Sequence, residues 1–292
     1  MTYYAARMSF FKSRQTVITP EKTQEKPIIL AEKFLITGPD HIKAHRISPE
    51  RRYIKGQVEF YIGNVLTEES RLLAFKIGKR KLRTRGTHSK KTFGEVEEEH
   101  FPASTVLWSA ESQMILIEKP KKDQMSVKAI IESLQDYLNG ALLVYGYAVL
   151  IAPLTHKAAF WNVIDKHSKI YSVEFKLFAP NLFNFSDTAK DLVDTTKEKY
   201  NAQETSIKIA NEKGNLLVQK EDNLIISLLE WIAPGAGKWV VSFDSDGKKR
   251  KIDSNSGSRT LDKDLPKYDA QTAKDFTNNA VDSMDNSDND DK

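Results

Sequence analysis

With 292 residues, of which 40% are hydrophobic and 29% charged, the chain has the composition of an ordinary globular protein, which excludes a fibrous or wholly disordered class. Its length predicts two packed subdomains rather than one, and its formal net charge is +4. Cysteine does not occur in the sequence, so disulfides, thiolate zinc sites and cysteine nucleophiles are excluded, and the reducing cytoplasm is the expected compartment.

The N-terminal part of the chain has mainly strand-like signals. Residues 12–27 lack apolar periodicity, so we expect an exposed connection there, followed by the apolar run 28–36. Residues 57–62 alternate between apolar and polar side chains, and residues 114–117 form a short apolar run. These signals predict a β-rich subdomain over residues 1–120.

The next segment has a helical rhythm. Apolar residues from Val127 to Leu138 recur at helical spacing, and Asn139-Gly140 is the expected C-terminal stop. The apolar run 141–154 is shorter than the roughly 20 residues that cross a bilayer as a helix, so it predicts a buried strand and no direct membrane insertion.

Helices and strands alternate after this run. A helix is expected after Pro153, to about residue 166, and a second one carries Leu192 and Val193 behind a cap at Ser186 or Asp187. Asp246-Gly247 accepts positive φ angles and predicts a closing hairpin. The other expected elements are a helix over 222–232 and strands over 169–178, 205–210, 239–243 and 249–252. The fold class is therefore α+β, with an α/β-alternating subdomain over residues 121–253.

The last segment, residues 254–292, is rich in Ser, Asn, Asp, Gly and Lys and poor in apolar residues. Such a segment cannot offset the entropy of ordering by burial, so it predicts a flexible acidic tail. Its end, residues 281–292, carries five aspartates and one lysine. The tail is either a phosphate mimic that competes for a basic surface of the same chain or a solubilising segment that contacts nothing.

Residues 76–91 hold eight cationic side chains and no acidic one. Such a density of like charge favours a nucleic-acid partner, because phosphates would neutralise the repulsion and release their counterions. Gly78 and Gly86 predict a mobile loop or hairpin tip, which favours contacts with phosphates over base reading. The alternative is a solvated loop, or one paired with the acidic tail. The predicted nucleic-acid-binding residues are Lys76, Lys79, Arg80, Lys81, Arg83, Arg85, Lys90 and Lys91.

A second basic and aromatic group precedes this segment. Its rings could stack on bases, as in single-strand binders, although the alternation around Phe60 equally fits packing in a core. The members of this group are Arg46, Arg51, Arg52, Tyr53, Lys55, Phe60 and Tyr61.

The sequence has no recognisable catalytic constellation, so no catalytic residue, metal ligand or cofactor is assigned. His41 and His45 are four residues apart but lack the glutamate of the zinc-protease motif. The stretch 235–238 ends like a phosphate loop, yet it lacks that motif's first glycine and its hydroxyl ligand for magnesium. The acidic residues of 95–99 contain the carboxylates that a metal nuclease needs, but a solvated run that balances the basic segment is the simpler interpretation.

The central part of the chain resembles a known family. An apolar strand ends at Pro153-Leu154, a short helix follows, and a strand with the sequence VEFK at 173–176 precedes a polar helix and a further strand. Over roughly residues 110–253, this order is similar to a family of largely uncharacterised bacterial proteins from mobile elements and to phage-exclusion proteins of the RexA kind. The resemblance implies a role in phage defence, with nucleic-acid binding as a sensing or regulatory step, and it carries over no catalytic residue.

Three functions follow from these observations. The first is a homo-oligomeric, non-enzymatic component of an antiphage system that binds nucleic acid, DNA rather than RNA, as a sensor or regulator, and acts with an effector protein encoded elsewhere. The second is a metal-dependent nuclease or RNase toxin of such a system. The third is a regulatory protein whose basic loop meets an acidic protein.

Overall fold

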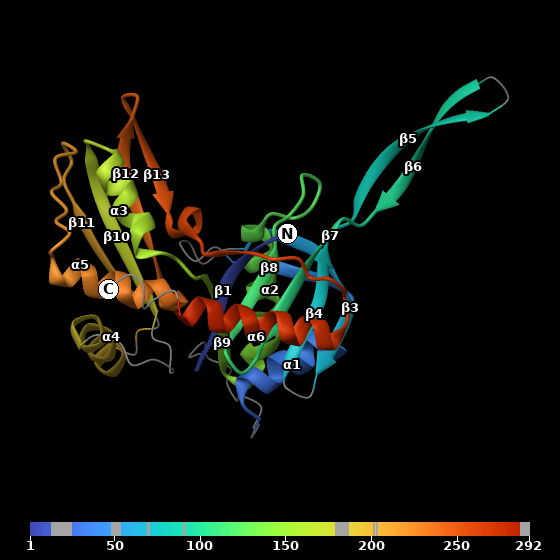
Figure 1. Cartoon of the computed structure of the whole chain (residues 1–292), viewed down its shortest axis with the longest axis horizontal. Helices are drawn as coiled ribbons and strands as arrows, with labels where there is room; N and C mark the ends of the chain where they lie inside the picture. Colours follow the sequence, from blue (N-terminus) through green and yellow to red (C-terminus); the bar gives the residue numbers. More distant parts are fainter. Residues whose placement is uncertain are drawn as a thin grey trace.

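The computed structural model describes residues 1–12, 25–47, 54–68, 71–89, 92–178, 187–200, 202 and 204–286. Its strands form an eight-stranded sheet, a four-stranded sheet and a two-stranded arm, and helices pack against the two larger sheets (Figure 1). The predicted α+β class is confirmed. None of the helices within these ranges is both long and apolar enough to pass through a bilayer.

Strand β1 (Thr2–Lys12) lies inside the eight-stranded sheet. It pairs antiparallel with β8 (Met114–Glu118) on one side, and with β9 (Tyr147–Pro153) and β14 (Thr260–Asp262) on the other. Beyond β8 the sheet continues through β7 (Ala103–Ser109), β4 (Leu72–Gly78), β3 (Ile54–Glu68) and β2 (His41–Ile47). The first strand of the chain is therefore held by segments from three distant parts of the sequence.

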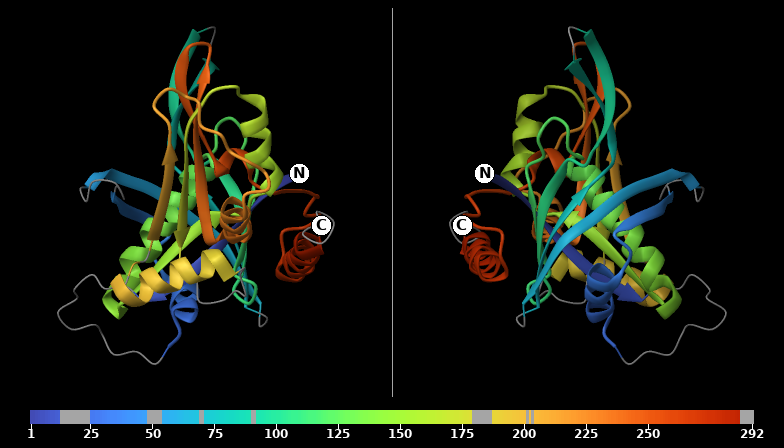
Figure 2. Two further views of the ribbon diagram at one scale, coloured as in Figure 1. Left: turned by 90° about the vertical axis from the view of Figure 1, so that its left-hand side faces the viewer. Right: turned by 90° about the vertical axis from the view of Figure 1, so that its right-hand side faces the viewer.

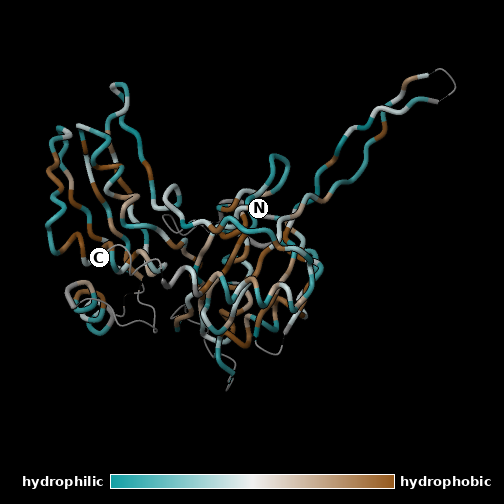
Figure 3. The backbone as a smooth tube through the Cα atoms, viewed as in Figure 1, coloured by the Kyte–Doolittle hydropathy of each residue, from teal (hydrophilic) through white to brown (hydrophobic). Residues whose placement is uncertain are grey.

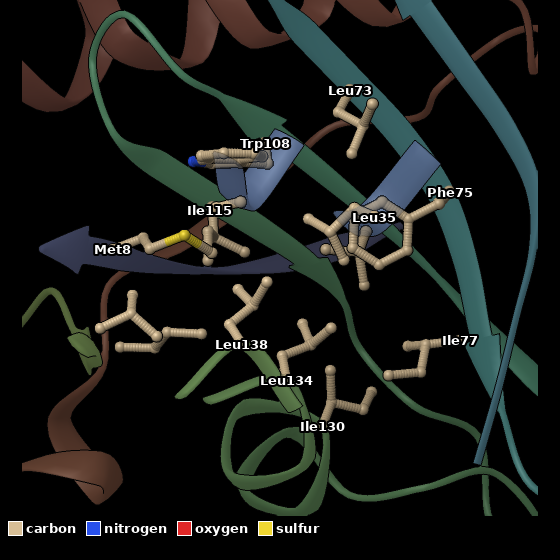
Figure 4. Close-up of a cluster of buried hydrophobic side chains, with 14 of the residues drawn as sticks. Met8, Leu35, Leu73, Phe75, Ile77, Trp108, Ile115, Ile130, Leu134 and Leu138 are labelled. Carbon is tan, nitrogen blue, oxygen red and sulfur yellow. The ribbon is translucent and has the colours of Figure 1, made fainter. Parts of the chain in front are cut away.

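The main core lies between this sheet and two helices, α1 (Pro27–Thr37) and α2 (Val127–Leu142). Figure 4 shows Met8 and Trp108 of the sheet above Leu134 and Leu138 of α2. The helix buries an apolar side chain at every fourth residue from Ile130 to Leu142, so its apolar stripe faces the sheet and the predicted helix is confirmed. Each such side chain stabilises the fold by roughly 1.5–3 kcal/mol.

The predicted stop at Asn139-Gly140 is wrong, because α2 continues through both residues. The side chain of Asn139 is held by β9: its amide donates to the Val149 carbonyl at 3.0 Å, and its Oδ1 accepts from the Val149 N–H at 2.7 Å. The helix ends instead in a short 3-10 turn, η1 (Leu143–Tyr145), followed by Gly146 at φ 73°. The run 141–154 is consequently the end of α2, this turn and the predicted buried strand β9.

The predicted flexible tail is also wrong over residues 254–286. A 3-10 turn η3 (Ser254–Gly257) leads to β14, and α6 (Ala270–Asn286) crosses the face of the large sheet opposite α2 (Figures 1 and 2). The buried residues Ala273, Phe276 and Ala280 form one stripe on this helix, and the ring of Phe276 lies 4.9 Å from that of Tyr3. The segment is poor in apolar residues on average, but it places these few on one face. Residues 287–292, with Asp288, lie outside the described part of the chain.

The four-stranded sheet has the order β11 (Glu204–Ala210), β10 (Ile170–Phe178), β12 (Gly237–Ser245) and β13 (Lys248–Asp253). One face packs on α3 (Lys157–Lys166), α4 (Asp187–Tyr200) and α5 (Asn223–Trp231), with Phe160, Phe175 and Trp239 in the centre of this core. These elements were predicted from the sequence.

Local chemistry fixes the ends of these elements. Asp222 caps α5 by accepting from the N–H groups of Leu224 and Ile225. The β12–β13 turn has positive φ at both Asp246 and Gly247, as the hairpin prediction requires. Gly235, at φ 89°, lies in the π-helical turn η2 (Ile232–Ala236) that leads into β12, so the stretch 235–238 is a turn before a strand, as the absence of the phosphate-loop residues predicted.

The predicted boundary after residue 120 does not separate the two units. Helix α2 and strand β9 follow that residue, yet they pack on or pair within the large sheet, and β9 matches β1 over seven residue pairs. The chain also returns to the large sheet with β14 and α6. The smaller sheet is thus inserted between two parts of the larger unit.

Candidate nucleic-acid interface

The predicted basic loop is a protruding β-arm. Its strands, β5 (Lys81–Ser89) and β6 (Thr92–His100), pair antiparallel with one another and with no other described strand (Figure 1). Figure 3 shows that the arm is mostly hydrophilic, in contrast to the strands of the two larger sheets. Residues 92–100 supply the complementary strand that turns the basic segment into a hairpin.

The base of the arm is held tightly. A Cβ added to Gly78, at the end of β4, would lie 2.6 Å from the carbonyl oxygen of Pro102, so this glycine permits close backbone packing there. A Cβ on Gly86, within β5, would meet nothing within 4 Å. The expectation of a mobile loop at these glycines is therefore replaced by an ordered strand.

The two faces of the arm carry opposite charge. Residues that oppose one another in an antiparallel pair project to the same side, and neighbours along a strand project to opposite sides. The pairs that begin at Lys81, Arg83 and Arg85 therefore define a basic face, which also holds Glu98. The intervening pairs define an acidic face, which holds Glu95, Glu97 and Glu99 opposite Gly86, Thr84 and Leu82.

Two ion pairs agree with this division. Arg85 lies 3.5 Å from Glu98 on the basic face, and Arg80, just before β5, lies 3.0 Å from Glu99 on the acidic face. Such exposed pairs contribute at most about 1 kcal/mol each. Among the described residues, neither Lys81 nor Arg83 forms an ion pair. Their charges are available to a partner.

A hydrogen bond joins the arm to a second basic segment. His100 is paired with Lys81 at the base of the basic face, and its Nε2 lies 3.1 Å from Oδ2 of Asp123. This hydrogen bond, more than any other contact, holds the pKa of Asp123 below its ordinary value, and the charge of Lys81 adds to the effect. Asp123 belongs to the loop 119–126 between β8 and α2.

The loop 119–126 is fixed by its own hydrogen bonds. The side chain of Gln124 accepts from the N–H of Lys121 at 2.6 Å and donates to the carbonyl of Ala103, and the N–H of Lys119 donates to the carbonyl of Thr2 at 2.7 Å. The loop is therefore held beside the base of the arm. We call the basic face of the arm and this loop together the basic track, and its cations are Lys81, Arg83, Arg85, Lys119, Lys121 and Lys122.

The structure divides the eight predicted binding residues. Lys81, Arg83 and Arg85 share the basic face, Lys79 is exposed at the base of the arm, and Arg80 is paired with Glu99. Lys76 lies apart from them, within β4, with its Nζ 5.2 Å from the centre of the Tyr268 ring near α6. Lys90 and Lys91 lie outside the described residues.

The aromatic group is divided as well. Phe60 is buried, so its packing interpretation is confirmed. Tyr61 stacks on His41, with ring centres 4.4 Å apart, and meets the exposed Phe101 edge-on. Arg51, Arg52 and Tyr53 lie outside the described residues, and no side-chain placement is described for His45, Arg46 and Lys55.

Two cationic runs were missed by the sequence reasoning. The first is the run Lys119, Lys121 and Lys122 of the basic track, and the second is residues 248–251 of β13, four consecutive exposed cations. The β12–β13 hairpin and the arm project from the same side of the molecule, with the loop 119–126 between them (Figures 1 and 2). Both runs are visible as short stretches of Lys and Arg, but only the fold shows that the first lies beside the base of the arm and that the second lies on the same side of the molecule (Figure 1).

The acidic residues of the arm do not form a metal centre. Glu95, Glu97 and Glu99 alternate along an exposed strand, and within the described ranges no three His, Asp or Glu side chains converge as metal ligands.

No family model, curated protein or solved structure matches the chain.

Proposed function

We propose that the protein binds nucleic acid by laying the basic track along a phosphate backbone. The observation that carries this proposal is the uneven distribution of charge on the arm, with three cations and one carboxylate on one face, three carboxylates on the other, and further lysines beside its base. If the charges on this hairpin only increased solubility, either face could carry either sign. A polyanion approaching from the basic side would neutralise the cations and release its own counterions.

The acidic face restricts how the arm meets the nucleic acid. A two-stranded ribbon fits the major groove of duplex DNA, but phosphates then flank it on both sides. Glu95, Glu97 and Glu99 would be repelled in that position. The basic face is better suited to lie along the backbone from outside, which positions the protein without reading bases.

The wider role rests on the resemblance of residues 110–253 to phage-exclusion proteins. On that basis we propose a cytoplasmic, homo-oligomeric sensor or regulator of an antiphage system that binds DNA and acts through an effector protein encoded elsewhere. The nuclease alternative gains no support from the described residues, because they contain no converging set of carboxylates.

A salt series tests the binding proposal. Fluorescence anisotropy would be measured with a labelled DNA duplex and with the RNA duplex of the same sequence, between 50 and roughly 300 mM salt, with heparin and an acidic polypeptide as competitors. Each phosphate contact is expected to contribute about 0.9 to the slope of log affinity against log salt for DNA. Binding that the acidic polypeptide removes as efficiently as DNA does would favour an acidic protein partner, and the lack of binding at low salt would contradict the proposal.

A further inference from the structure

A pocket of about 470 Å³ opens beside the basic track. It lies between the start of β1, the loop 119–126 and the first turns of α2, and its volume is within the range of small-molecule sites. Apolar groups form its walls: Tyr4, Ile117, Pro120, Ile131 and Pro153. It is a partly open hollow with apolar walls next to a row of cations.

Four lysines and no carboxylate line this pocket. The lysines are Lys119, Lys121, Lys122 and Lys128. Lys128 lies 4.0 Å from Glu132, which is outside the lining, whereas among the described residues Lys119, Lys121 and Lys122 form no ion pair. The lack of a carboxylate in the pocket lining leaves a net positive site suited to a doubly charged anion.

The backbone adds to this positive potential. The Oγ of Ser126 accepts from the N–H of Ala129 at 3.2 Å, which satisfies one donor at the start of α2. The N–H groups of Val127 and Lys128, in the first turn, have no carbonyl within the helix to pair with, and both residues line the pocket. They lie at the positive end of a helix of 16 residues.

Tyr4 supplies the aromatic wall of the pocket. It is half-buried and belongs to none of the three apolar clusters of the described chain, in contrast to its neighbour Tyr3. Its ring is thus a surface on which a planar group such as a base can stack.

We infer that this pocket binds a nucleoside phosphate, with the base against Tyr4 and the apolar wall and the phosphate among the lysines and the first turn of α2. The phosphate belongs either to a free mononucleotide or to the phosphorylated end of a nucleic-acid strand. The second case rests on the proposed function, since such a strand would reach the pocket along the basic track. A sugar would leave the lysines without an anionic partner, and a fatty acid would offer no planar ring to stack on Tyr4.

Calorimetric titration of the full chain with adenosine 5′-monophosphate tests the inference, with the guanosine, cytidine and uridine monophosphates alongside. Adenosine and inorganic phosphate, each half of the ligand, should bind at least tenfold more weakly. Lys121→Ala with Lys122→Ala should weaken binding at least tenfold, since both side chains are exposed and their loss leaves the core intact. Tyr4→Ala should weaken it and Tyr4→Phe should restore it, because the ring and not the hydroxyl makes the contact.

Two further measurements distinguish the sources and separate this inference from the proposed function. A single-stranded oligonucleotide with a 5′-phosphate should bind more tightly than its 5′-hydroxyl form if the ligand is a strand end, and equally if it is a free mononucleotide. The triple variant Lys81→Ala, Arg83→Ala and Arg85→Ala should lose duplex binding and keep mononucleotide binding. If the protein binds the duplex but neither binds any of the four monophosphates nor prefers a 5′-phosphate, the inference about the pocket is wrong and the proposed function stands. Mononucleotide binding without duplex binding would overturn the proposed function alone.

Discussion

His100, the last residue of β6, lies with its Nε2 3.1 Å from Oδ2 of Asp123 in the loop 119–126. The two residues are 23 positions apart in the sequence and connect two basic segments. The chain connections to β4 and β7 join the arm to the body, and this contact adds a side-chain link at its base. The contact therefore helps to hold the cations of the arm and of the loop as one surface.

Replacing His100 by alanine should raise the pKa of Asp123 towards its ordinary value of 3.8, because the hydrogen bond to His100 is the main cause of its lowering. The sign follows from linkage: a carboxyl whose pKa is lowered by folding stabilises the fold above its unfolded pKa, and this stabilisation is lost as the pH falls through the lowered pKa. An NMR titration of the side-chain carboxyls would measure the change. An Asp123 pKa that stays the same in the variant would show that the hydrogen bond is not its cause.

Phe276→Ala should destabilise the protein by about 3–5 kcal/mol, since the ring is buried against Tyr3 and its removal leaves a cavity under α6. Phe93→Ala is the matched control, because this ring on the arm is 85% exposed and its loss should change stability by less than about 0.5 kcal/mol. Urea denaturation of both variants compares them. Equal stabilities would mean that α6 is docked without contributing to the fold.

Stability should fall between pH 10 and pH 12 through the ionisation of Tyr3. Burial, together with the charges of Glu118 and Asp264, raises its pKa to about 12 from 10.0. In that interval the unfolded chain loses a proton that the folded chain retains, so unfolding becomes more favourable as the pH rises. Tyr3→Phe should remove a loss on the order of 1–3 kcal/mol across this interval. Denaturation midpoints at pH 9, 10 and 11 would show the flatter profile, and parallel profiles would contradict this role for Tyr3.

The sequence predicted the structure best where the residue pattern of a helix or turn depends on that element alone. The helical spacing of Ile130, Leu134 and Leu138 reports burial against a single sheet, and Asp246-Gly247 determines its turn by backbone sterics. The C-terminal helix was missed because its buried side chains are only a few, Ala273, Phe276 and Ala280. They stabilise the helix only through packing on the large sheet, which the local sequence does not show. The Asn139-Gly140 pair is typical of a helix end, yet the side chain of Asn139 bonds to β9 within a continuing helix. The spacing of residues in the sequence does not reveal this partner.

The candidate site was predicted only in part, for a similar reason. The density of positive charge identified Lys81, Arg83 and Arg85 as binding residues. Their position on one face follows from the alternation of side chains along a strand, and the sequence predicted a loop or hairpin tip at this place. Lys76 is close in sequence to the arm but lies in a different environment, with its Nζ over the ring of Tyr268. The pocket combines β1, the loop 119–126, α2 and Pro153, and no local pattern brings these segments together.

The central claim is that nucleic acid meets the basic face of the arm. It is tested most directly by anisotropy titrations of a labelled DNA duplex across a salt series, with the basic-face variant Lys81→Ala, Arg83→Ala and Arg85→Ala and the matched acidic-face variant Glu95→Gln, Glu97→Gln and Glu99→Gln. We predict that the basic-face variant loses at least tenfold in affinity and that its salt slope becomes shallower by about 0.9 for each lost contact. The acidic-face variant should bind as tightly as the wild type or more tightly. A folded basic-face variant with the affinity and salt slope of the wild type would contradict the claim.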